Sequence, residues 1–402
     1  MMQRILIIGA GFAGLWSALA AARRLEIEGS KDGAIEVALI APEPILTIRP
    51  RLYEAAPDDM TASLENLFEE TGVRYIQGSV ETIRANTDEV DYINASGERL
   101  TLSYHRLVMA AGSKLFRPDI PGLRQYAFSV DQRDEAAALD VHLKNLAQQP
   151  ASLKRDTVIV AGGGFTGLEI ATELPGRLKK VLGSDANIRI MIVERADAIG
   201  PGLGSGPRPV IDKALSELGI EYRLGSAVAV ISADGLKTAD GEYIEAGTII
   251  WTAGVRANAL TAQISAERDE LGRLRVDHDL RVPSAPKIFA AGDAAVAPTD
   301  DQGNHTLMSC QHAIPAGKSA GDNAAADLLG QRPTPYSQPH YVTCLDLGSA
   351  GAVVTRGRDR KIWLTGAEGK TMKMMINGTL IYPPADRDAA FAAADPQQAL
   401  SL

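Results

Sequence analysis

The sequence predicts an α/β protein with two dinucleotide-binding units and a small C-terminal α+β region. Two observations carry this prediction. A short apolar strand runs into a glycine-rich turn and a helix at the start of the chain, and the same arrangement returns in its middle. Much of the remaining sequence alternates between strand-like and helix-like stretches, which is typical of parallel sheets covered by helices.

The first glycine turn has the GxGxxG spacing at Gly9, Gly11 and Gly14. In such a turn the first glycine permits the tight bend, the second lets backbone N–H groups approach a phosphate, and the third lets the helix pack on the strand. The helix begins near Phe12 and Ala13, so the positive end of its dipole would face a pyrophosphate.

The second turn repeats the spacing at Gly162, Gly164 and Gly167, and its helix begins at Phe165 and Thr166. A single turn of this kind also serves simply to close a sharp bend between a strand and a helix. The repeat favours the functional interpretation, in which one chain binds two dinucleotides.

An acidic residue after the second strand of such a unit commonly binds the ribose hydroxyls. In the first unit, polar Ser30–Gly33 precede the strand Ile35–Ile40, and Glu43 is the nearest carboxylate. Glu43 serves equally well as an ordinary loop residue. In the second unit Glu194 follows the strand directly, which favours NADH over NADPH because a carboxylate repels a 2′-phosphate. The neighbouring Arg195 keeps NADPH open.

The proline-rich segment 44–59 is expected to be a loop at the carboxyl ends of parallel strands, where ligands bind. It contains Arg49, Arg51 and Tyr53, whose alternative interpretation is a solvated surface. An amphipathic helix is expected over Thr61–Glu70. The elements expected further along are strands at Val73–Gln77, Val80–Arg84, Leu100–Leu102, Ile188–Val193 and Thr248–Ile250, and a helix at Asp131–Gln148.

Three buried strands end in small residues, which are needed where the backbone passes close to a ligand or another strand. Ala111 and Gly112 end the first, and Gly254 ends the second. Gly292 and Asp293 end the third, where an acid can cap the next segment or hold a chain of sugar hydroxyls.

Two places offer reactive groups. Glu169 lies in the first turn of the second dinucleotide helix, where it is either a carboxylate stabilised by the helix dipole or a group that faces a nicotinamide. Cys310 and Gln311 lie near the start of a helix expected over Leu307–Leu329.

The C-terminal region is expected to contain three strands, a short helix at Lys370–Asn377 and a loosely held tail after Pro384. The helix has Met372, Met375 and Ile376 on one side, which we expect to be its core side, and lysines on the other. The three strands are expected at Tyr341–Leu347, Ala352–Thr355 and Lys361–Leu364.

Composition narrows the function classes. The chain of 402 residues has a formal net charge of −9, which argues against binding to nucleic acid and against strong attraction to anionic membranes. Its two cysteines form no CxxC pair, so no disulfide scaffold and no metal site is expected. No run of 18 or more apolar residues is present that could span a membrane, and the first strand is expected to begin at residue 4, which leaves no room for a signal peptide. A cytoplasmic or peripheral location is therefore expected.

Five motifs in order resemble the two-dinucleotide flavoproteins of the pyridine nucleotide-disulfide reductase type, and within them the type II NADH:quinone oxidoreductase family. They are GAGFAG, RPRLYE, GGGFTGLE, FAAGDAA and SCQHAIPAGKSAGDN. The resemblance implies two Rossmann-like domains: residues 1–116 with 280–335 for FAD, and residues 117–279 for NAD(H). The C-terminal region is then 336–402.

The resemblance also implies the cofactor contacts. FAD would lie on Gly9, Gly11, Gly14, Ala111, Gly112 and Asp293, the last holding the ribityl chain, and NADH on Gly162, Gly164, Gly167 and Glu194. Further cofactor contacts are expected at Phe12, Ala13, Glu43, Arg49, Arg51, Val80, Phe165, Thr166, Gly254, Gly292 and Ala313. Catalytic roles are expected for Glu169, near the nicotinamide and flavin rings, and for Gln311 and Cys310.

The family's quinone-side motif AQxAxQ is altered here, since Cys310 and Pro315 replace its first alanine and last glutamine. The expected activity is transfer of hydride from NADH to FAD and of electrons to a quinone. The alternatives are a soluble reductase for a ferredoxin-like protein, a small organic molecule or oxygen, and a redox sensor. Thiol chemistry is disfavoured, because segment 42–59 lacks the cysteine pair of disulfide reductases. Weak peripheral membrane contact and a homodimer are further expectations from the resemblance.

Overall fold

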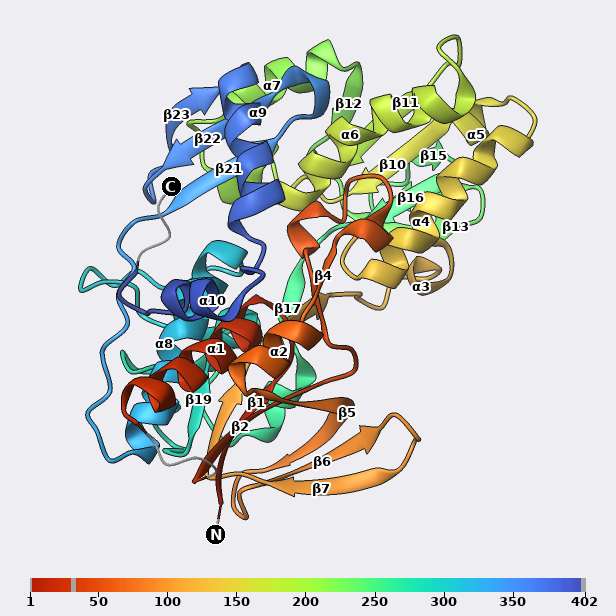
Figure 1. Ribbon diagram of the computed structural model, residues 1–402. Helices are drawn as coiled ribbons and strands as arrows, with labels where there is room; N and C mark the ends of the chain where they lie inside the picture. Colours follow the sequence, from red (N-terminus) through yellow and green to blue (C-terminus); the bar gives the residue numbers. More distant parts are fainter. Residues whose placement is uncertain (1, 30–33, 399–402) are drawn as a thin grey trace.

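The largest sheet has seven strands in the order β19-β8-β1-β2-β5-β6-β7 (Figure 1). The computed structural model describes residues 2–29 and 34–398, so Ser30–Gly33 lie outside the described residues. The run from β19 to β5 is parallel, and β6 and β7 continue it as an antiparallel meander. The strands are β1 (Gln3–Ile8), β2 (Ile35–Ala41), β5 (Arg74–Arg84), β6 (Glu89–Asn94), β7 (Arg99–Ser103), β8 (Arg106–Met109) and β19 (Ile288–Ala290).

A second sheet of four parallel strands, in the order β12-β11-β10-β16, carries the second glycine turn. Its strands are β10 (Thr157–Ala161), β11 (Arg189–Val193), β12 (Ile220–Arg223) and β16 (Thr248–Trp251). Smaller pieces flank the two sheets: β3 (Ile45–Thr47), β4 (Thr61–Ser63), β9 (Ser113–Leu115), β13 (Val228–Ser232), β14 (Gly235–Thr238), β15 (Tyr243–Glu245), β17 (Val255–Ala257), β18 (Leu274–Arg275) and β20 (Ala295–Val296).

The C-terminal unit consists of an antiparallel sheet of β21 (Val342–Asp346), β22 (Ala352–Arg356) and β23 (Lys361–Thr365) and of helix α9 (Gly366–Met375), which packs on β22. Figure 1 draws it in blue beside helices α6 and α7 of the second sheet. The approach is close, because a Cβ added to Gly348 would lie 2.1 Å from the carbonyl oxygen of Thr172 on α6. The helices are α1 (Phe12–Ile27), α2 (Glu65–Thr71), α3 (Leu123–Tyr126), α4 (Arg133–Asn145), α5 (Leu153–Asp156), α6 (Phe165–Leu182), α7 (Arg208–Glu217), α8 (Cys310–Leu328), α9 (Gly366–Met375) and α10 (Arg387–Ala393).

The predicted fold class is confirmed, because both glycine turns connect a buried parallel strand to a helix. The domain boundaries stay a prediction. Within residues 2–29 and 34–398, no helix has both the length and the apolar character needed to cross a membrane.

Two predictions near residue 60 were wrong. Segment 44–59 is not only a loop, and the helix expected over Thr61–Glu70 begins only at Glu65. Ile45–Thr47 and Thr61–Ser63 pair instead as antiparallel strands. The two paired strands are separated in the sequence by residues 48–60. The hydrophobic spacing within Thr61–Glu70 therefore could not indicate this pairing, because strand formation depends on the partner strand.

The C-terminal predictions also need correction. Helix α9 begins at Gly366, before the predicted start, and the face it buries includes Lys373, whereas Met375 is 44% exposed. Lys373 is buried because it has a carboxylate partner on α6, which lies far away in sequence. The described part of the tail, up to Gln398, is not loosely held either, since α10 buries Ala390 and Phe391.

Helices α1 and α8 lie against each other with very little space between them. A Cβ on Gly321 would lie 1.9 Å from the carbonyl oxygen of Ser17, and one on Gly317 would lie 2.5 Å from that of Ala13. The Ser17 hydroxyl also donates to the carbonyl oxygen of Gly317 across the contact, at 2.9 Å. This packing fixes the start of α8 beside the start of α1.

We predict that Gly321→Ala lowers the free energy of unfolding by about 1–3 kcal/mol, because the added methyl group forces the two backbones apart. Gly176→Ala on α6 is the control: its added Cβ meets no atom of residues 2–29 and 34–398 within 4 Å, and the change should be neutral or stabilising by about 0.4–1 kcal/mol. Denaturant melts of both variants measure this. Equal stability of the two would contradict the close-packing account.

Candidate active site between the two glycine turns

A cavity of about 520 Å³ lies where three units of the fold meet: the seven-stranded sheet with its helices, the four-stranded sheet with its helices, and the C-terminal unit. The first glycine turn, the second glycine turn, the start of α8 and the C-terminal unit all contribute to its wall. The predicted site residues that line it are Gly11, Phe12, Ala13, Arg49, Gly112, Gly164, Phe165, Thr166, Glu169, Asp293, Cys310, Gln311 and Ala313.

The outer glycines of each turn are required by the backbone itself. A Cβ on Gly14 would lie 1.8 Å from the carbonyl oxygen of Gly9, and one on Gly167 would lie 1.8 Å from that of Gly162. Gly9 and Gly162 also have positive φ angles of 106° and 118°, which L side chains rarely adopt. Both turns therefore follow the same geometry, with the helix packed directly on the strand.

The middle glycines are different, because they face open space. A Cβ on Gly11 or Gly164 would meet no atom of the described residues within 4 Å. Each is the N-cap of its helix, and in the part of the chain that the structure describes neither helix has a side-chain cap. The first N–H groups of α1 and α6 thus lack side-chain acceptors next to the cavity, an arrangement that suits a phosphate. The two turns fit a pair of dinucleotides.

Glu194 is held by the backbone of the second turn. One carboxylate oxygen accepts from the N–H of Gly163 at 2.6 Å, and the other accepts from the N–H of Ala196 at 2.7 Å. Each oxygen keeps a lone pair for another donor. The carboxylate can therefore accept further hydrogen bonds, and its ribose-binding role stays a prediction.

A polar cluster lies beside the first turn. The guanidinium of Arg49 pairs with Asp131 at 2.5 Å and donates to the Ser113 hydroxyl at 3.2 Å. Ser113 in turn donates to Asp293 at 2.6 Å. Arg49, Ser113, Asp131 and Asp293 all line the cavity, so this wall offers both donors and acceptors to a polar ligand chain.

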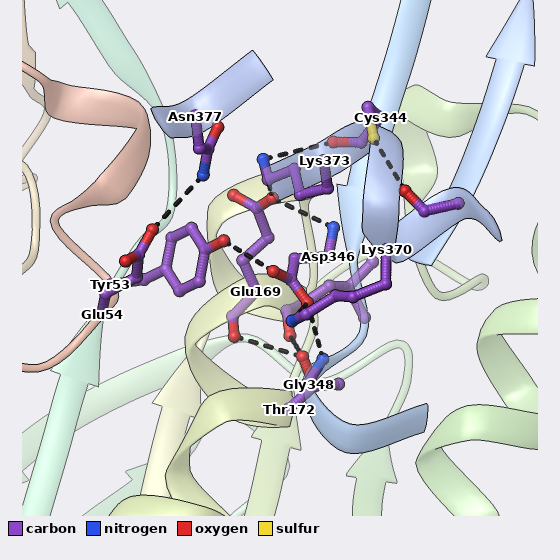
Figure 2. A network of polar contacts seen from close by, with 12 residues as sticks. Tyr53, Glu54, Glu169, Thr172, Cys344, Asp346, Gly348, Lys370, Lys373 and Asn377 are labelled. Carbon is purple, nitrogen blue, oxygen red and sulfur yellow. Dashed lines mark hydrogen bonds and ion pairs between the residues drawn. The ribbon is translucent and has the colours of Figure 1, made fainter. Parts of the chain in front are cut away.

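A buried ion pair forms another part of the cavity wall (Figure 2). Lys373 Nζ lies 2.7 Å from Glu169 Oε1, and both side chains are almost fully buried. The same Oε1 accepts from the N–H of Asp346 at 3.1 Å. Lys373 also donates to the carbonyl oxygen of Cys344 at 3.3 Å. Helix α6 and the C-terminal unit are thereby joined through charged groups.

Asp346 is itself held by three donors (Figure 2). Its carboxylate accepts from the Tyr53 hydroxyl at 2.8 Å, from Lys370 Nζ at 2.6 Å and from the N–H of Gly348 at 2.9 Å. Tyr53 comes from the segment after β3, so the network connects all three units. The position of Glu169 thus depends on contacts from the whole molecule.

Burial raises the pKa of Glu169 to about 7, although the charge of Lys373 opposes the rise. Burial lowers the pKa of Lys373, but the neighbouring Glu169 outweighs burial and leaves that pKa above its ordinary value. Lys373 therefore stays protonated, and Glu169 gains and loses a proton near neutral pH.

The other predicted reactive groups behave differently. Burial raises the pKa of Cys310 to about 11, so its thiol stays protonated at neutral pH and is a poor nucleophile. The side-chain oxygen of Gln311 accepts from the N–H of Val342 at 3.2 Å. This contact holds the first strand of the C-terminal unit against the start of α8.

Several predicted cofactor residues do not line the cavity. Glu43 pairs with Arg133, Arg51 pairs with Glu54, and Val80 lies within β5. Their cofactor roles stay predictions. Among the described residues, the complete set outside the lining is Gly9, Gly14, Glu43, Arg51, Val80, Ala111, Gly162, Gly167, Glu194, Gly254 and Gly292.

Sequence reasoning missed Lys373, Asp346 and Arg360 as site residues, although Lys373 and Arg360 line the cavity. They lie in the C-terminal region, where no glycine turn or other local motif marks a site. The one available signal was the position of Lys373 on the side of the helix opposite to the methionines. That pattern was wrong, because it predicted the methionine side to be the buried face.

The protein-family comparison matches residues 3–317 to the family described as pyridine nucleotide-disulphide oxidoreductase. The chain belongs to this family. The family name includes disulphide chemistry, but the two cysteines of this oxidoreductase, Cys310 and Cys344, are both free.

Similar proteins extend over nearly the whole chain. A NADH dehydrogenase-like protein of Mycobacterium tuberculosis is 42% identical, covering 98% of this chain and 99% of its own length. A type II NADH:quinone oxidoreductase of Staphylococcus haemolyticus is 27% identical, covering 94% and 95%. The solved structure of NDH2 from Plasmodium falciparum in complex with NADH superposes with a TM-score of 0.79 at 17% identity and covers 98% of both chains. This last likeness supports the fold.

We predict that Glu169 makes folding stability depend on pH. Its pKa is about 7 in the folded chain and near 4.5 ordinarily, so the folded chain binds the proton more tightly. Stability from this proton is fully present below about pH 4.5 and is lost as pH rises through about 7. The melting temperature of the natural protein should therefore fall relative to that of Glu169→Gln between about pH 5 and about pH 8.

Glu270→Gln is the control, because the Glu270 side chain is exposed. This variant should follow the pH curve of the natural protein. A constant difference between the natural protein and Glu169→Gln across this pH range would contradict the shifted pKa.

Proposed function

We propose that this protein is an FAD-dependent NADH:quinone oxidoreductase. The observation that carries the proposal is a single cavity that reaches both open glycine turns and whose wall includes the buried pair of Glu169 and Lys373. Two dinucleotides and a proton-exchanging group thus have access to one space. The names of two relatives, NADH dehydrogenase-like protein and type II NADH:quinone oxidoreductase, support the same activity.

We assign one dinucleotide to each turn. FAD would lie on Gly11 and the start of α1, with Asp293 accepting from its sugar hydroxyls. NADH would lie on Gly164 and the start of α6, with Glu194 accepting from its ribose. The same carboxylate would repel a 2′-phosphate, so NADPH should bind less well. When bound, FAD supplies the two-electron chemistry that links NADH to the acceptor.

The chain's own residues would supply the proton. Reduction of a quinone to a quinol by NADH consumes one proton beyond the hydride, because NADH, a proton and quinone yield NAD⁺ and quinol. Glu169 holds an exchangeable proton at a carboxylate oxygen on the cavity wall, since its pKa lies near 7. A general acid works best when its pKa is close to the working pH. Lys373 would hold Glu169 in place through their ion pair. Its positive charge would balance the carboxylate that remains after Glu169 has given up its proton.

A peripheral position at a membrane would suit an apolar quinone. Helix α9, which contributes Lys373 to the cavity wall, exposes Met374 and Met375 on its outer side, at 65% and 44%. Exposed apolar side chains on one side of a helix can rest in the interfacial region of a bilayer. We include weak peripheral contact in the proposal on this basis.

We predict that the purified, FAD-loaded protein consumes NADH with a short-chain quinone much faster than in air alone. Glu169→Gln should lower the quinone-dependent kcat by about 100-fold, because it removes the proton donor. Glu173→Gln is the matched control, since Glu173 lies one turn further along α6 and does not line the cavity. FAD content should be equal in all three proteins.

Turnover no faster with quinone than in air would refute quinone as the acceptor. It would direct the search to a protein acceptor, another small molecule or redox sensing. Equal losses in Glu169→Gln and Glu173→Gln would refute the assigned role of Glu169.

A further inference from the structure

Among the described residues, three cationic side chains line the cavity. Arg49 pairs with Asp131 at 2.5 Å. Lys373 pairs with Glu169 at 2.7 Å. Arg360 differs from both, because within residues 2–29 and 34–398 it has no carboxylate within ion-pair distance and its contacts are with a hydroxyl and a carbonyl oxygen. It therefore brings an uncompensated positive charge to the cavity.

Arg360 lies on the turn between β22 and β23, yet its guanidinium reaches the NADH side of the cavity. Nη1 donates to the Thr343 hydroxyl at 3.1 Å, and Nη2 lies 3.5 Å from the carbonyl oxygen of Gly202. The loop that contains Gly202 is attached to the second glycine turn, because the N–H of Gly200 donates to the carbonyl oxygen of Gly163 at 3.0 Å. The guanidinium thus contacts the loop that is itself hydrogen-bonded to the second glycine turn.

Backbone conformation and packing contacts together define the position of Arg360. Its φ angle of 57° is in the left-handed region, where an arginine is uncommon. Its guanidinium lies over the ring of Tyr341, 4.8 Å from the centroid. Gly206 allows the close approach, because a Cβ there would lie 3.0 Å from the carbonyl oxygen of Arg360. A guanidinium has five N–H donors, so several remain for a ligand.

We propose that Arg360 binds the diphosphate of the nicotinamide dinucleotide, so that the C-terminal unit closes the NADH site. This inference rests on the proposed function, which assigns NADH to the second glycine turn. The start of α6 offers only partial positive charge, whereas a diphosphate carries two negative charges. A guanidinium that can donate two parallel hydrogen bonds to phosphate oxygens supplies the missing charge.

The competing interpretation is that Arg360 only ties the C-terminal sheet to the loop at Gly202. A tie of that kind would affect stability, but it would not distinguish a ligand with phosphates from one without them. The test must therefore compare two ligands that differ in the diphosphate.

Calorimetric titration of the FAD-loaded protein with ADP-ribose, and with adenosine by competition, makes this comparison. The variants are Arg360→Gln and Arg360→Lys. Arg358→Gln is the matched control, because Arg358 lies on the same turn and over the same Tyr341 ring but donates to Thr299 and His305 and does not line the cavity.

Arg360→Gln should weaken ADP-ribose binding about tenfold, as expected for loss of a charge-assisted contact, and should leave adenosine binding unchanged. Arg360→Lys should retain part of the affinity, and Arg358→Gln all of it. Added salt should weaken ADP-ribose binding to the natural protein more than to Arg360→Gln, because the salt-screened charge is absent there.

Three results would overturn the inference: unchanged ADP-ribose affinity in Arg360→Gln, an equal loss in Arg358→Gln, or an equal loss for adenosine. Absence of ADP-ribose binding to the natural protein would overturn it as well. None of these measurements requires quinone turnover. A protein that binds ADP-ribose through Arg360 but does not reduce quinone would therefore refute the proposed acceptor and leave this inference standing.

Discussion

The buried pair of Glu169 and Lys373 is the interaction on which the site depends. Two charges removed from water are costly, and they are tolerated only where their remaining donors and acceptors are satisfied. Here the N–H of Asp346 and the carbonyl oxygen of Cys344 meet that need. Tyr53 then holds Asp346 from a different part of the chain. The pair and its partners come from all three units, so these contacts hold the units together around one cavity.

The two glycine turns explain why a cavity exists at that place. In each turn the outer glycines let helix and strand backbones touch, whereas Gly11 and Gly164 leave space in front of an uncapped helix. A sheet with such a turn has a buried core, and the backbone N–H groups at the start of the helix that follows the turn can still donate to a ligand. Two such ends open onto the same space, and the C-terminal unit contributes the charged groups Lys373 and Arg360 to its wall.

The sequence predicted what depends on short-range patterns and missed what depends on distant partners. Gly14 can be interpreted without knowing the rest of the fold, because the clash it avoids is with the carbonyl oxygen of Gly9, only five residues earlier. The buried face of α9 could not be predicted, since Lys373 is buried only because Glu169 meets it there. For the same reason Arg360 gave no signal, as its neighbours at Gly202 and Tyr341 are brought together only by the fold.

The most direct test of this account is the protonation of Glu169 itself. Infrared difference spectra of the natural protein and Glu169→Gln, recorded across neutral pH, would reveal the C=O stretch of a protonated carboxylic acid. Because the pKa of Glu169 is about 7, we expect a band that disappears near pH 7 in the natural protein and is absent from the variant. A natural protein without that band, or with a band that disappears at the ordinary pKa of a glutamate, would contradict the central role given to the buried pair.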